Sequence, residues 1–441
     1  MSTGNENGAE NAQDSSLDHG LTNLSLSSKT IHADDYLNEG PDVAPPMHVS
    51  TTFRYSRDSR SLKAWVERTV SLPSGQELVN QLTMLKPEEA SEGHIYSRYT
   101  APNTTRFEAI LSHILKGPTL TYASGLSAFH ALLVFLNPKQ ISIGAGYHGC
   151  HGVIGIHQKL TGLKKIALDC AAEDLQPGDI IHIETPLNPT GTAYNLKEFA
   201  DKAHSRGAFL TVDATFGPPP LQDPLLWGAD ITMHSGTKYI GGHSDMLCGI
   251  LTINPKHGDW FEELLQERAF MGSVMGSMEG WLGIRSVRTL EVRVQRQASN
   301  TTELVAWLDA NLHSGKAADC VTPSFGDGEA VQKVLSKIEH ASLQREDIED
   351  GWLTKQMPNG FGPVFSICMK DLDLARKLPS KLKLFHHATS LGGVESLIEW
   401  RSMTDSSVDP TLLRISVGIE GWEDLRDDLL QGFKALAAER K

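Results

Sequence analysis

A regular alternation of short apolar segments with helical segments, between residues 124 and 253, constrains the fold more than any other feature of the sequence. The apolar segments have the length and composition of buried strands, and they lie at 140–144, 164–169, 180–185, 207–214, 229–235 and 247–253. Helical stretches separate several of them, beginning with 124–136, which opens with a capping serine. This alternation predicts an α/β fold with a mostly parallel, doubly wound sheet. Ligands of such sheets bind at the carboxyl ends of the strands.

Composition and hydrophobic patterning divide the chain into four parts. Residues 1–29 are rich in Asn, Ser, Gly and acidic residues, and we expect a disordered leader. Residues 30–95 read as an extended N-terminal arm with a charged insertion, which we expect to be helical over 54–92. Residues 96–295 carry the strand–helix alternation of a large domain. Residues 296–441 predict a smaller α+β domain that closes with an amphipathic helix.

Charge and composition exclude several classes of protein. The chain has 40 basic and 54 acidic residues, a net charge of −14, which argues against binding to nucleic acid. It contains no apolar run of the roughly 18 residues that a membrane span requires. The five cysteines form no CxxC pair and no metal-ligand spacing, which predicts reduced thiols and no metal site. Because no Lys or Arg precedes Lys29, we expect no targeting peptide and a cytoplasmic protein.

The strongest local signal for chemistry is the segment 234–239 (HSGTKY), directly after a predicted strand. It places Lys238 beside two small hydroxyl residues, Ser235 and Thr237. Such an arrangement suits a cofactor that carries an aldehyde and a phosphate, because the amine can form a Schiff base while the hydroxyls donate to phosphate oxygens. The alternative interpretation is a surface loop with an ordinary lysine.

Four other strand ends or helix starts carry candidate residues. Asp213 can pair with a protonated ring nitrogen, although a strand-end Asp is more often a turn residue. The segment 124–126 opens a helix and can bind an anion at its N-terminus, or can simply cap it. Asn188 can reach an oxygen on a ring or form an Asx turn, and Tyr147 can stack on a ring or pack in the core.

A different interpretation rests on the glycines after the strand at 140–144. Gly144, Gly146 and Gly149 precede a predicted helix, and Asp169 ends the next strand about 20 residues further on. This spacing is that of a dinucleotide-binding fingerprint and would fit an NAD-dependent dehydrogenase. It leaves the segments around Lys238 and Asp213 without a role.

Seven stretches together resemble the Cys/Met-metabolism (trans-sulfuration) family of fold-type-I enzymes that use pyridoxal 5′-phosphate (PLP). This family includes cystathionine γ-synthase and γ-lyase. The stretches lie at 45–53 (PPMHVSTTF), 95–98 (IYSR), 122–128 (YASGLSA), 184–191 (ETPLNPTG), 212–245, 390–399 (SLGGVESLIE) and 413–420 (LRISVGIE). They follow one another in the family's order over nearly the whole chain after the leader.

The resemblance implies a PLP site in the large domain, with Lys238 as the Schiff-base lysine and proton shuttle. Asp213 would hold the pyridinium nitrogen, Asn188 the ring oxygen, and Tyr147 would stack on the ring as a second catalytic residue. Gly125, Leu126, Ser235 and Thr237 would hold the phosphate.

The same resemblance implies a substrate site and an oligomer. Arg414 would grip the α-carboxylate of an amino-acid substrate as a bidentate fork, with Ser390 beside it. Glu395 matches a position near the distal part of the substrate. Tyr96 and Arg98 resemble a pair that reaches the phosphate of a neighbouring subunit, which implies a homodimer or homotetramer with shared sites.

The activity that the resemblance favours is γ-substitution on an O-acylated homoserine, because 390–399 looks like the synthases. Cystathionine γ- or β-lyase elimination, O-acylhomoserine sulfhydrylase activity and a non-catalytic member of the fold remain alternatives. The sequence departs from the family in the residues after Arg98, in the longer segment between Phe53 and Tyr96, and at Asp405, where many members have His. These departures concern the choice of substrate rather than the cofactor.

Overall fold

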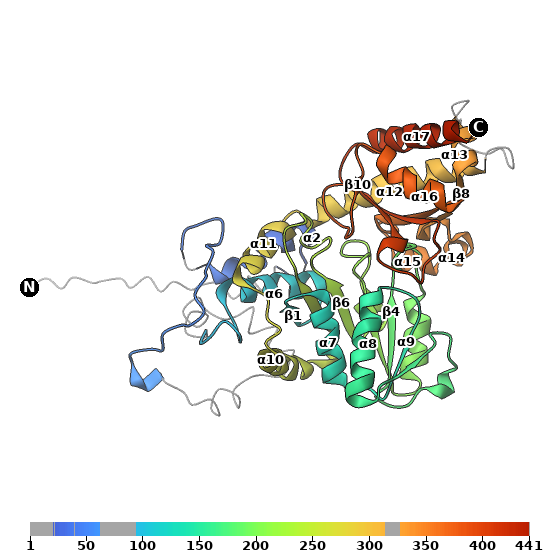
Figure 1. The fold of residues 1–441 in the computed structure, drawn as a ribbon. Coiled ribbons are helices and arrows are strands. Elements are labelled where there is room, and N and C mark those ends of the chain that lie inside the picture. Colours follow the sequence, from blue (N-terminus) through green and yellow to red (C-terminus); the bar gives the residue numbers. More distant parts are fainter. Residues whose placement is uncertain (1–20, 22, 39, 62–93, 314–326, 441) are drawn as a thin grey trace, which may run out of the picture.

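The computed structural model describes residues 21, 23–38, 40–61, 94–313 and 327–440. Most of the predicted leader and most of the predicted helical insertion, 54–92, therefore lie outside the described residues. Figure 1 shows two layered units, with the strands of the large domain below and the C-terminal helices above. A short helix, α2 (Leu26–His32), begins within the segment predicted as leader and is capped by Ser25.

A seven-stranded sheet forms the centre of the large domain and confirms the predicted α/β fold. Its order is β1-β7-β6-β5-β4-β2-β3. The strands are β1 (Thr119–Tyr122), β2 (Gln140–Ile143), β3 (Lys164–Ile166), β4 (Ile180–Glu184), β5 (Phe209–Asp213), β6 (Ile231–Ser235) and β7 (Gly249–Ile253). The strands β6, β5, β4, β2 and β3 are parallel, whereas β7 runs antiparallel to both β6 and β1. The sheet is thus mostly parallel, as the alternation predicts.

Helices cover both faces of this sheet. They are α6 (Pro102–Leu115), α7 (Gly125–Leu136), α8 (His148–Thr161), α9 (Leu196–His204), α10 (Trp260–Met271) and α11 (Ser277–Val287). Consecutive residues of β4 show the division, since Ile180 packs in the cluster that contains α7 and α8, and Ile181 in the cluster that contains α9. Side chains alternate across a strand, so both faces are buried and the strands are apolar almost throughout.

A second, five-stranded sheet belongs to the C-terminal domain, with the order β10-β11-β12-β9-β8. Its strands are β8 (Leu335–Glu339), β9 (Val364–Met369), β10 (His386–His387), β11 (Leu397–Trp400) and β12 (Leu412–Ser416). The accompanying helices are α13 (Asp327–Val334), α14 (Arg345–Glu349), α15 (Trp352–Gln356), α16 (Leu372–Lys381) and α17 (Trp422–Glu439). This sheet and its helices form the smaller α+β domain that the sequence predicts, and α17 is its closing helix.

One long helix, α12 (Leu290–Leu312), connects the two domains. The predicted domain boundary at residue 296 falls inside this helix, because the helical pattern continues through it. Its first half packs in the core of the large domain, and its second half packs against the C-terminal sheet. Figure 1 shows α12 rising from the large domain into the C-terminal one.

Short 3₁₀ turns complete the described chain and one of them, η7, borders the site. They are η1 (Asp35–Leu37), η2 (Ser59–Ser61), η3 (Ala172–Asp174), η4 (Pro224–Trp227), η5 (Pro255–His257), η6 (Ala341–Leu343) and η7 (Arg401–Met403). Among the described helices, none has both the length and the apolar composition to cross a membrane. No group of His, Cys, Asp and Glu in the described ranges is arranged to hold a metal ion.

Candidate active site

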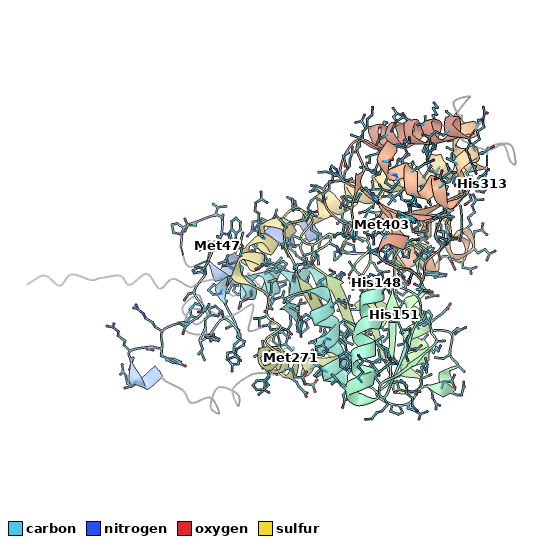
Figure 2. All side chains as sticks on the ribbon, in the orientation of Figure 1. Met47, His148, His151, Met271, His313 and Met403 are labelled. Carbon is cyan, nitrogen blue, oxygen red and sulfur yellow. The ribbon has the colours of Figure 1, made fainter. Side chains whose placement is uncertain are left out.

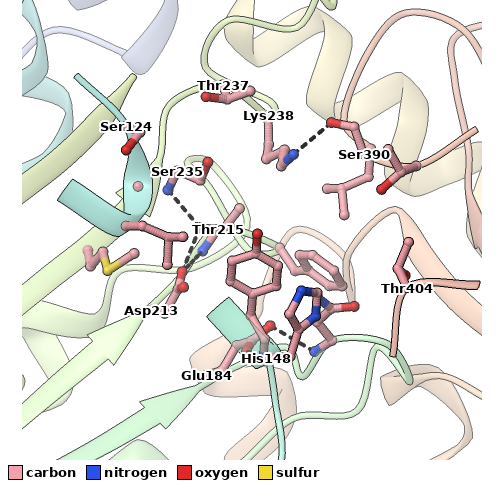
Figure 3. A pocket seen from close by; sticks show the side chains of 18 of the residues that line it. Ser124, His148, Glu184, Asp213, Thr215, Ser235, Thr237, Lys238, Ser390 and Thr404 are labelled. Carbon is pink, nitrogen blue, oxygen red and sulfur yellow. Dashed lines mark hydrogen bonds between the residues drawn. The ribbon is translucent and has the colours of Figure 1, made fainter. Parts of the chain in front are cut away.

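A cavity of about 420 Å³ lies where the strands β4, β5 and β6 end and where the C-terminal domain meets the large one. Its walls bring together residues from segments more than 250 positions apart in the sequence, as Figure 3 shows. Ten of the predicted site residues line it: Gly125, Leu126, Tyr147, Asn188, Asp213, Ser235, Thr237, Lys238, Ser390 and Arg414. The rule that ligands bind at the carboxyl ends of parallel strands holds here.

One end of the cavity is built by the N-terminus of α7. Ser124 caps the helix, since its Oγ accepts a hydrogen bond from the N–H of Ser127 at 3.2 Å. Gly125 approaches Ser235 so closely that a Cβ at this position would lie 3.1 Å from the Ser235 Cβ. Unpaired N–H groups and the positive end of the helix dipole therefore face a hydroxyl group across a narrow space, which is favourable for an anion.

The Thr237 hydroxyl differs from that of Ser235 because it already has partners in the backbone. Its Oγ1 accepts the N–H of Cys248 at 3.0 Å and lies 3.4 Å from the Cys248 carbonyl oxygen. The side chain still lines the cavity. Thr237 thus fixes the turn before Lys238 as well as facing the anion-binding end.

Asp213 is the last residue of β5, and only one of its two carboxylate oxygens accepts hydrogen bonds from described residues. Its Oδ1 accepts from the N–H of Thr215 at 3.0 Å and from the Thr215 hydroxyl at 2.5 Å. Within the described part of the chain, no hydrogen bond reaches Oδ2. Burial raises the pKa of Asp213, and the two bonds from Thr215 oppose this shift. A cationic N–H donor in the cavity would offset the cost of keeping this carboxylate ionised.

Glu184 lies beside Asp213 in the sheet, and its carboxylate accepts hydrogen bonds from two predicted site residues. The strands pair Glu184 with Asp213 in register. The Oε2 of Glu184 accepts the backbone N–H of Tyr147 at 2.7 Å, and its Oε1 accepts that of Asn188 at 2.9 Å. Burial and the adjacent Asp213 carboxylate raise the pKa of Glu184. One carboxylate thereby fixes the two loops that carry Tyr147 and Asn188.

Lys238 reaches into the cavity from the turn after β6. Its Nζ donates to the Ser390 Oγ at 2.6 Å, and Figure 3 shows this contact. Burial lowers the pKa of Lys238 to about 8, and the positive charge of Arg414 acts in the same direction. An amine with this pKa is neutral in roughly one molecule in ten at pH 7, far more often than an ordinary lysine, so it can act as a nucleophile or a base.

The segment that carries Ser390 packs directly on the turn that carries Lys238. Gly392 has φ +81°, and a Cβ there would lie 2.8 Å from the backbone nitrogen of Tyr239. Only glycine allows this close approach with a left-handed backbone. This explains why the SLGG motif and the Lys238 motif, far apart in the sequence, meet at one site.

Arg414 crosses the cavity wall from β12 and is 4% exposed. Its Nη1 donates to the Asn188 Oδ1 at 3.1 Å, and its Nη2 donates to the Ser390 carbonyl oxygen at 2.8 Å. Nη2 also pairs with Glu399 at 2.5 Å. These contacts hold the guanidinium in the wall of the cavity.

Three predicted residues do not line the cavity of their own chain. Arg98 donates to the Ala269 carbonyl oxygen at 3.1 Å and lies over the ring of Tyr96, which is 42% exposed. Glu395 accepts a hydrogen bond from Ser244, and its carboxylate is not part of the cavity wall. The structure therefore gives no support to a distal-substrate role for Glu395, whereas the exposed Tyr96 stays compatible with a contact in a second subunit.

Several cavity residues were not assigned a role from the sequence. They are His148, Glu184, Thr215, Thr389, Arg401 and Thr404. Glu184 had a detectable signal, because it ends a buried strand next to the strand of Asp213. Arg401 had none, since an arginine in a turn is usually exposed.

Comparison with protein families gives a match to the Cys/Met metabolism PLP-dependent enzymes over residues 27–434. The chain belongs to the Cys/Met metabolism family of PLP-dependent enzymes. The predicted resemblance is thus confirmed, and with it the interpretation as an enzyme that uses PLP. The dinucleotide interpretation of Gly144, Gly146, Gly149 and Asp169 is wrong, because the family that matches residues 27–434 uses PLP.

Relatives in this family differ in the reaction they catalyse. A cystathionine β-lyase of Lactococcus lactis subsp. cremoris is 30% identical over 77% of this chain and 88% of its own. A cystathionine γ-synthase of Mycobacterium bovis is 32% identical over 77% of this chain and 86% of its own. The crystal structure of MetB from Corynebacterium glutamicum has a TM-score of 0.77 and 26% identity, covering 94% of this chain and 99% of that one. The family is therefore established, and its members similar to this chain include both lyases and a synthase.

The residues of the cavity fit PLP in charge and in shape. The α7 N-terminus and Ser235 form an anion-binding cradle that a side chain at Gly125 would fill. The open Oδ2 of Asp213 suits a protonated ring nitrogen, and the neutral fraction of Lys238 suits an aldehyde. The Asn188 amide nitrogen makes no hydrogen bond to any described residue, so it is available to a ring oxygen.

Proposed function

We propose that this protein catalyses γ-substitution on an O-acylated homoserine, in the manner of a cystathionine γ-synthase. The observation that carries the proposal is the meeting of Lys238, Asp213 and Arg414 in one cavity. These groups are a base, a carboxylate for the ring nitrogen and a carboxylate-binding fork, which is what chemistry at the α-carbon of an amino acid requires. When bound, PLP supplies the electron sink for a proton lost from Cα.

In this proposal each residue has a defined task. Arg414 binds the substrate α-carboxylate and so orients Cα toward Lys238. The neutral Nζ of Lys238 takes the proton from Cα, because its lowered pKa makes the free amine accessible. Asp213 keeps the ring nitrogen protonated, Asn188 donates to the ring oxygen, and Tyr147 packs on the ring face. The 124–126 segment, Ser235 and Thr237 hold the phosphate.

For γ-substitution a second proton must leave Cβ, after which the acyl group departs as a carboxylate. We assign Lys238 as the base for both steps: it would pass the Cα proton to the bound cofactor before it takes the Cβ proton, and Ser390 keeps its amine within the cavity. A thiol nucleophile then forms a bond to Cγ and gives up its proton, and Cβ and Cα each regain one proton, with Lys238 as the donor. The resemblance of 390–399 to the synthases and the M. bovis γ-synthase relative support substitution.

Elimination is the second candidate, and the lyases among the relatives favour it. Incubation with O-acetyl-, O-succinyl- and O-phosphohomoserine, with and without cysteine, separates the two. Substitution is expected to give cystathionine only when cysteine is present. Equal formation of 2-oxobutanoate and ammonia with and without cysteine would assign the protein to the lyases. Lys238→Ala should abolish either reaction.

We further propose that the enzyme is a cytoplasmic homodimer or homotetramer with shared sites. The free thiols of Cys150, Cys170, Cys248 and Cys368 support a reducing compartment. The exposed Tyr96 and the neighbouring Arg98 support a contact with the phosphate of a second subunit. Analytical ultracentrifugation of the holoenzyme measures the oligomeric state.

A further inference from the structure

His148 lines the cavity beside Tyr147, and the proposed function gives it no task. It is the first residue of α8 and is exposed. The centroid of its ring lies 4.9 Å from that of the Tyr147 ring. Neither of its ring nitrogens makes a hydrogen bond to a described residue. The imidazole is therefore available to a group that enters the cavity.

The attack of a thiol on Cγ requires a proton acceptor, because the thiolate is the nucleophilic form of sulfur. Lys238 is not available then, since it holds the proton that it has taken from Cβ. Burial raises the pKa of Tyr147, so its phenol stays protonated near neutral pH. Both carboxylate oxygens of Glu184 accept backbone N–H groups, and Asp213 faces the ring nitrogen of the cofactor.

The remaining ionisable side chains of the cavity are two arginines and His148. An arginine stays protonated in proteins and accepts no proton. Histidine is the side chain that exchanges a proton most readily near neutral pH. Among the described residues that line the cavity, His148 is thus the one left to take the proton of an attacking thiol.

Asp405 places a negative charge close to His148. It follows η7 in the C-terminal domain, and its side chain is 8% exposed and lies 3.6 Å from Arg401. Burial raises the pKa of Asp405, and hydrogen bonds from Ser407 lower it. The charges of Arg401 and His148 lower it further, so the pKa of Asp405 lies below its usual value. His151, one turn along α8, also interacts with this carboxylate. A proton gained by His148 is therefore placed near a carboxylate that is ionised.

His148 lies away from the end of the cavity that binds the phosphate. Figure 3 shows Ser124 on one side of the cavity and Thr404 on the opposite side, with His148 on the side of Thr404. Figure 2 shows His148 and His151 near the start of α8, below Met403 of η7. Because His148 is exposed, a second substrate can reach it from solvent while the first substrate occupies the cavity.

We propose that His148 is a second catalytic residue, the general base for the thiol that attacks Cγ. This inference rests on the proposed function, because a thiol attacks Cγ only in substitution. The S–H bond breaks, and its proton passes to a ring nitrogen of His148. The S–Cγ bond forms, and Cβ receives the electron pair of the Cβ–Cγ double bond and takes a proton from Lys238. His148 then releases its proton to solvent.

The test compares L-cysteine with L-selenocysteine as the second substrate of the holoenzyme, at a saturating concentration of the ester. The two nucleophiles have nearly the same shape, but the selenol is ionised at neutral pH and needs no base. His148→Asn should lower kcat/KM for cysteine on the order of 100-fold, the usual size of a lost general base. It should lower kcat/KM for selenocysteine far less. An equal loss for both nucleophiles would overturn the proposal, because His148 would then act on binding alone.

The pH dependence of kcat/KM for cysteine is an independent measurement. In His148→Asn it should follow the ionisation of the thiol itself, with a midpoint of about 8.5. In the wild type it should rise at lower pH, because the imidazole removes the proton from the neutral thiol. Identical profiles in the two proteins would contradict the assignment.

NMR of holoenzyme labelled at its histidine ring carbons follows the ring without any reaction. The signal of His148 is identified by its loss in His148→Asn. We expect this signal to move between its protonated and neutral positions within the pH range in which the enzyme is active. A signal that stays fixed over this range would exclude proton exchange at His148.

His151→Asn is the matched control. His151 also interacts with Asp405, but it is not among the residues that line the cavity. This variant should keep kcat/KM for both nucleophiles and the wild-type pH profile. If it shows the same selective loss for cysteine as His148→Asn, the effect comes from the charge around Asp405 and the proposal fails.

Leaving groups separate this inference from the proposed function. If cystathionine is cleaved and no ester undergoes substitution, γ-substitution fails, and His148 should act in the reverse direction by protonating the departing thiol. His148→Asn should then slow cystathionine cleavage on the order of 100-fold, and slow elimination from an ester far less, since a carboxylate leaves without a proton. Equal effects on both would remove the role of His148. If substitution occurs and His148→Asn shows no selectivity for cysteine, the base fails and γ-substitution stands.

Discussion

Replacement of Glu184 by Gln tests whether one carboxylate fixes both cofactor-facing loops. The carboxylate offers two acceptor oxygens, and each receives a backbone N–H, from Tyr147 at 2.7 Å and from Asn188 at 2.9 Å. Glutamine has almost the same shape but only one carbonyl oxygen. Its NH₂ group would face an N–H donor, so one of the two hydrogen bonds must be lost.

The structure indicates which bond would be lost and how large the effect is. Asn188 is 5% exposed, whereas Tyr147 is 37% exposed, so water can replace the acceptor at Tyr147 but not at Asn188. We therefore expect the glutamine oxygen to face Asn188 and the Tyr147 loop to lose its bond. Loss of the acceptor for a buried backbone N–H costs about 1–3 kcal/mol, and hydration of Tyr147 recovers part of it. The remaining loss corresponds to an increase on the order of tenfold in the dissociation constant of PLP.

The assay is the dissociation constant of PLP, measured by equilibrium dialysis and by the visible absorbance of the holoenzyme. Glu184→Gln should weaken PLP binding on the order of tenfold and lower kcat, while the thermal transition of the folded chain changes little. Glu198→Gln is a matched control, since Glu198 is exposed and its carboxylate accepts, from the described residues, only a hydrogen bond of the local Asn195 side chain. Wild-type PLP affinity and kcat in Glu184→Gln would refute the role of this carboxylate in holding the loops.

Three further predictions concern the cofactor site. The rate at which PLP recombines with apoenzyme should rise with pH with a midpoint near 8, because only the neutral Lys238 amine attacks an aldehyde; a midpoint near 10.5 would contradict the effect of burial. Asp213→Asn should lower kcat on the order of 100-fold while the circular dichroism spectrum is retained, and unchanged kinetics would reduce Asp213 to a turn residue. Mixing Arg98→Ala with Lys238→Ala protomers should restore activity after subunit exchange. If Arg98 acts in the neighbouring subunit's site, both defects fall in one site of each heterodimer and the other site is intact. No recovery after verified exchange would place Arg98 in its own chain's site.

The cofactor side of the cavity could be predicted from the sequence because it depends on strand ends. Residues that follow parallel strands meet at one edge of a sheet, so Asp213, Asn188 and the Lys238 turn had to lie close together. Tyr147 followed from the same rule at the end of β2. The mostly parallel order of the sheet was predictable for the same reason, since apolar strands alternated with helices.

The substrate side could not be predicted in the same way. Glu399 lies on a strand and Arg401 in the turn after it, and both are buried in ion pairs that join them to each other and to Arg414, which no local pattern reveals. Glu395 was expected near the substrate from its place in a motif. It lies in a loop, which does not fix side-chain direction, and its carboxylate turns toward Ser244. The strand β1 was missed because it has only four residues and no flanking alternation.

The continuous helix α12 determines which parts of the molecule can move when a substrate binds. Its 23 residues contain no Pro and no Gly, so it spans about 34 Å without a site at which a helix normally kinks. Leu290 and Val294 pack in the large domain, and Leu304 and Leu308 pack in the C-terminal one. A hinge rotation of one domain against the other would have to bend this helix and separate a shared apolar core. We therefore expect the cavity to close around a substrate through the loops at 388–394 and 401–411, with the two domains moving as one body.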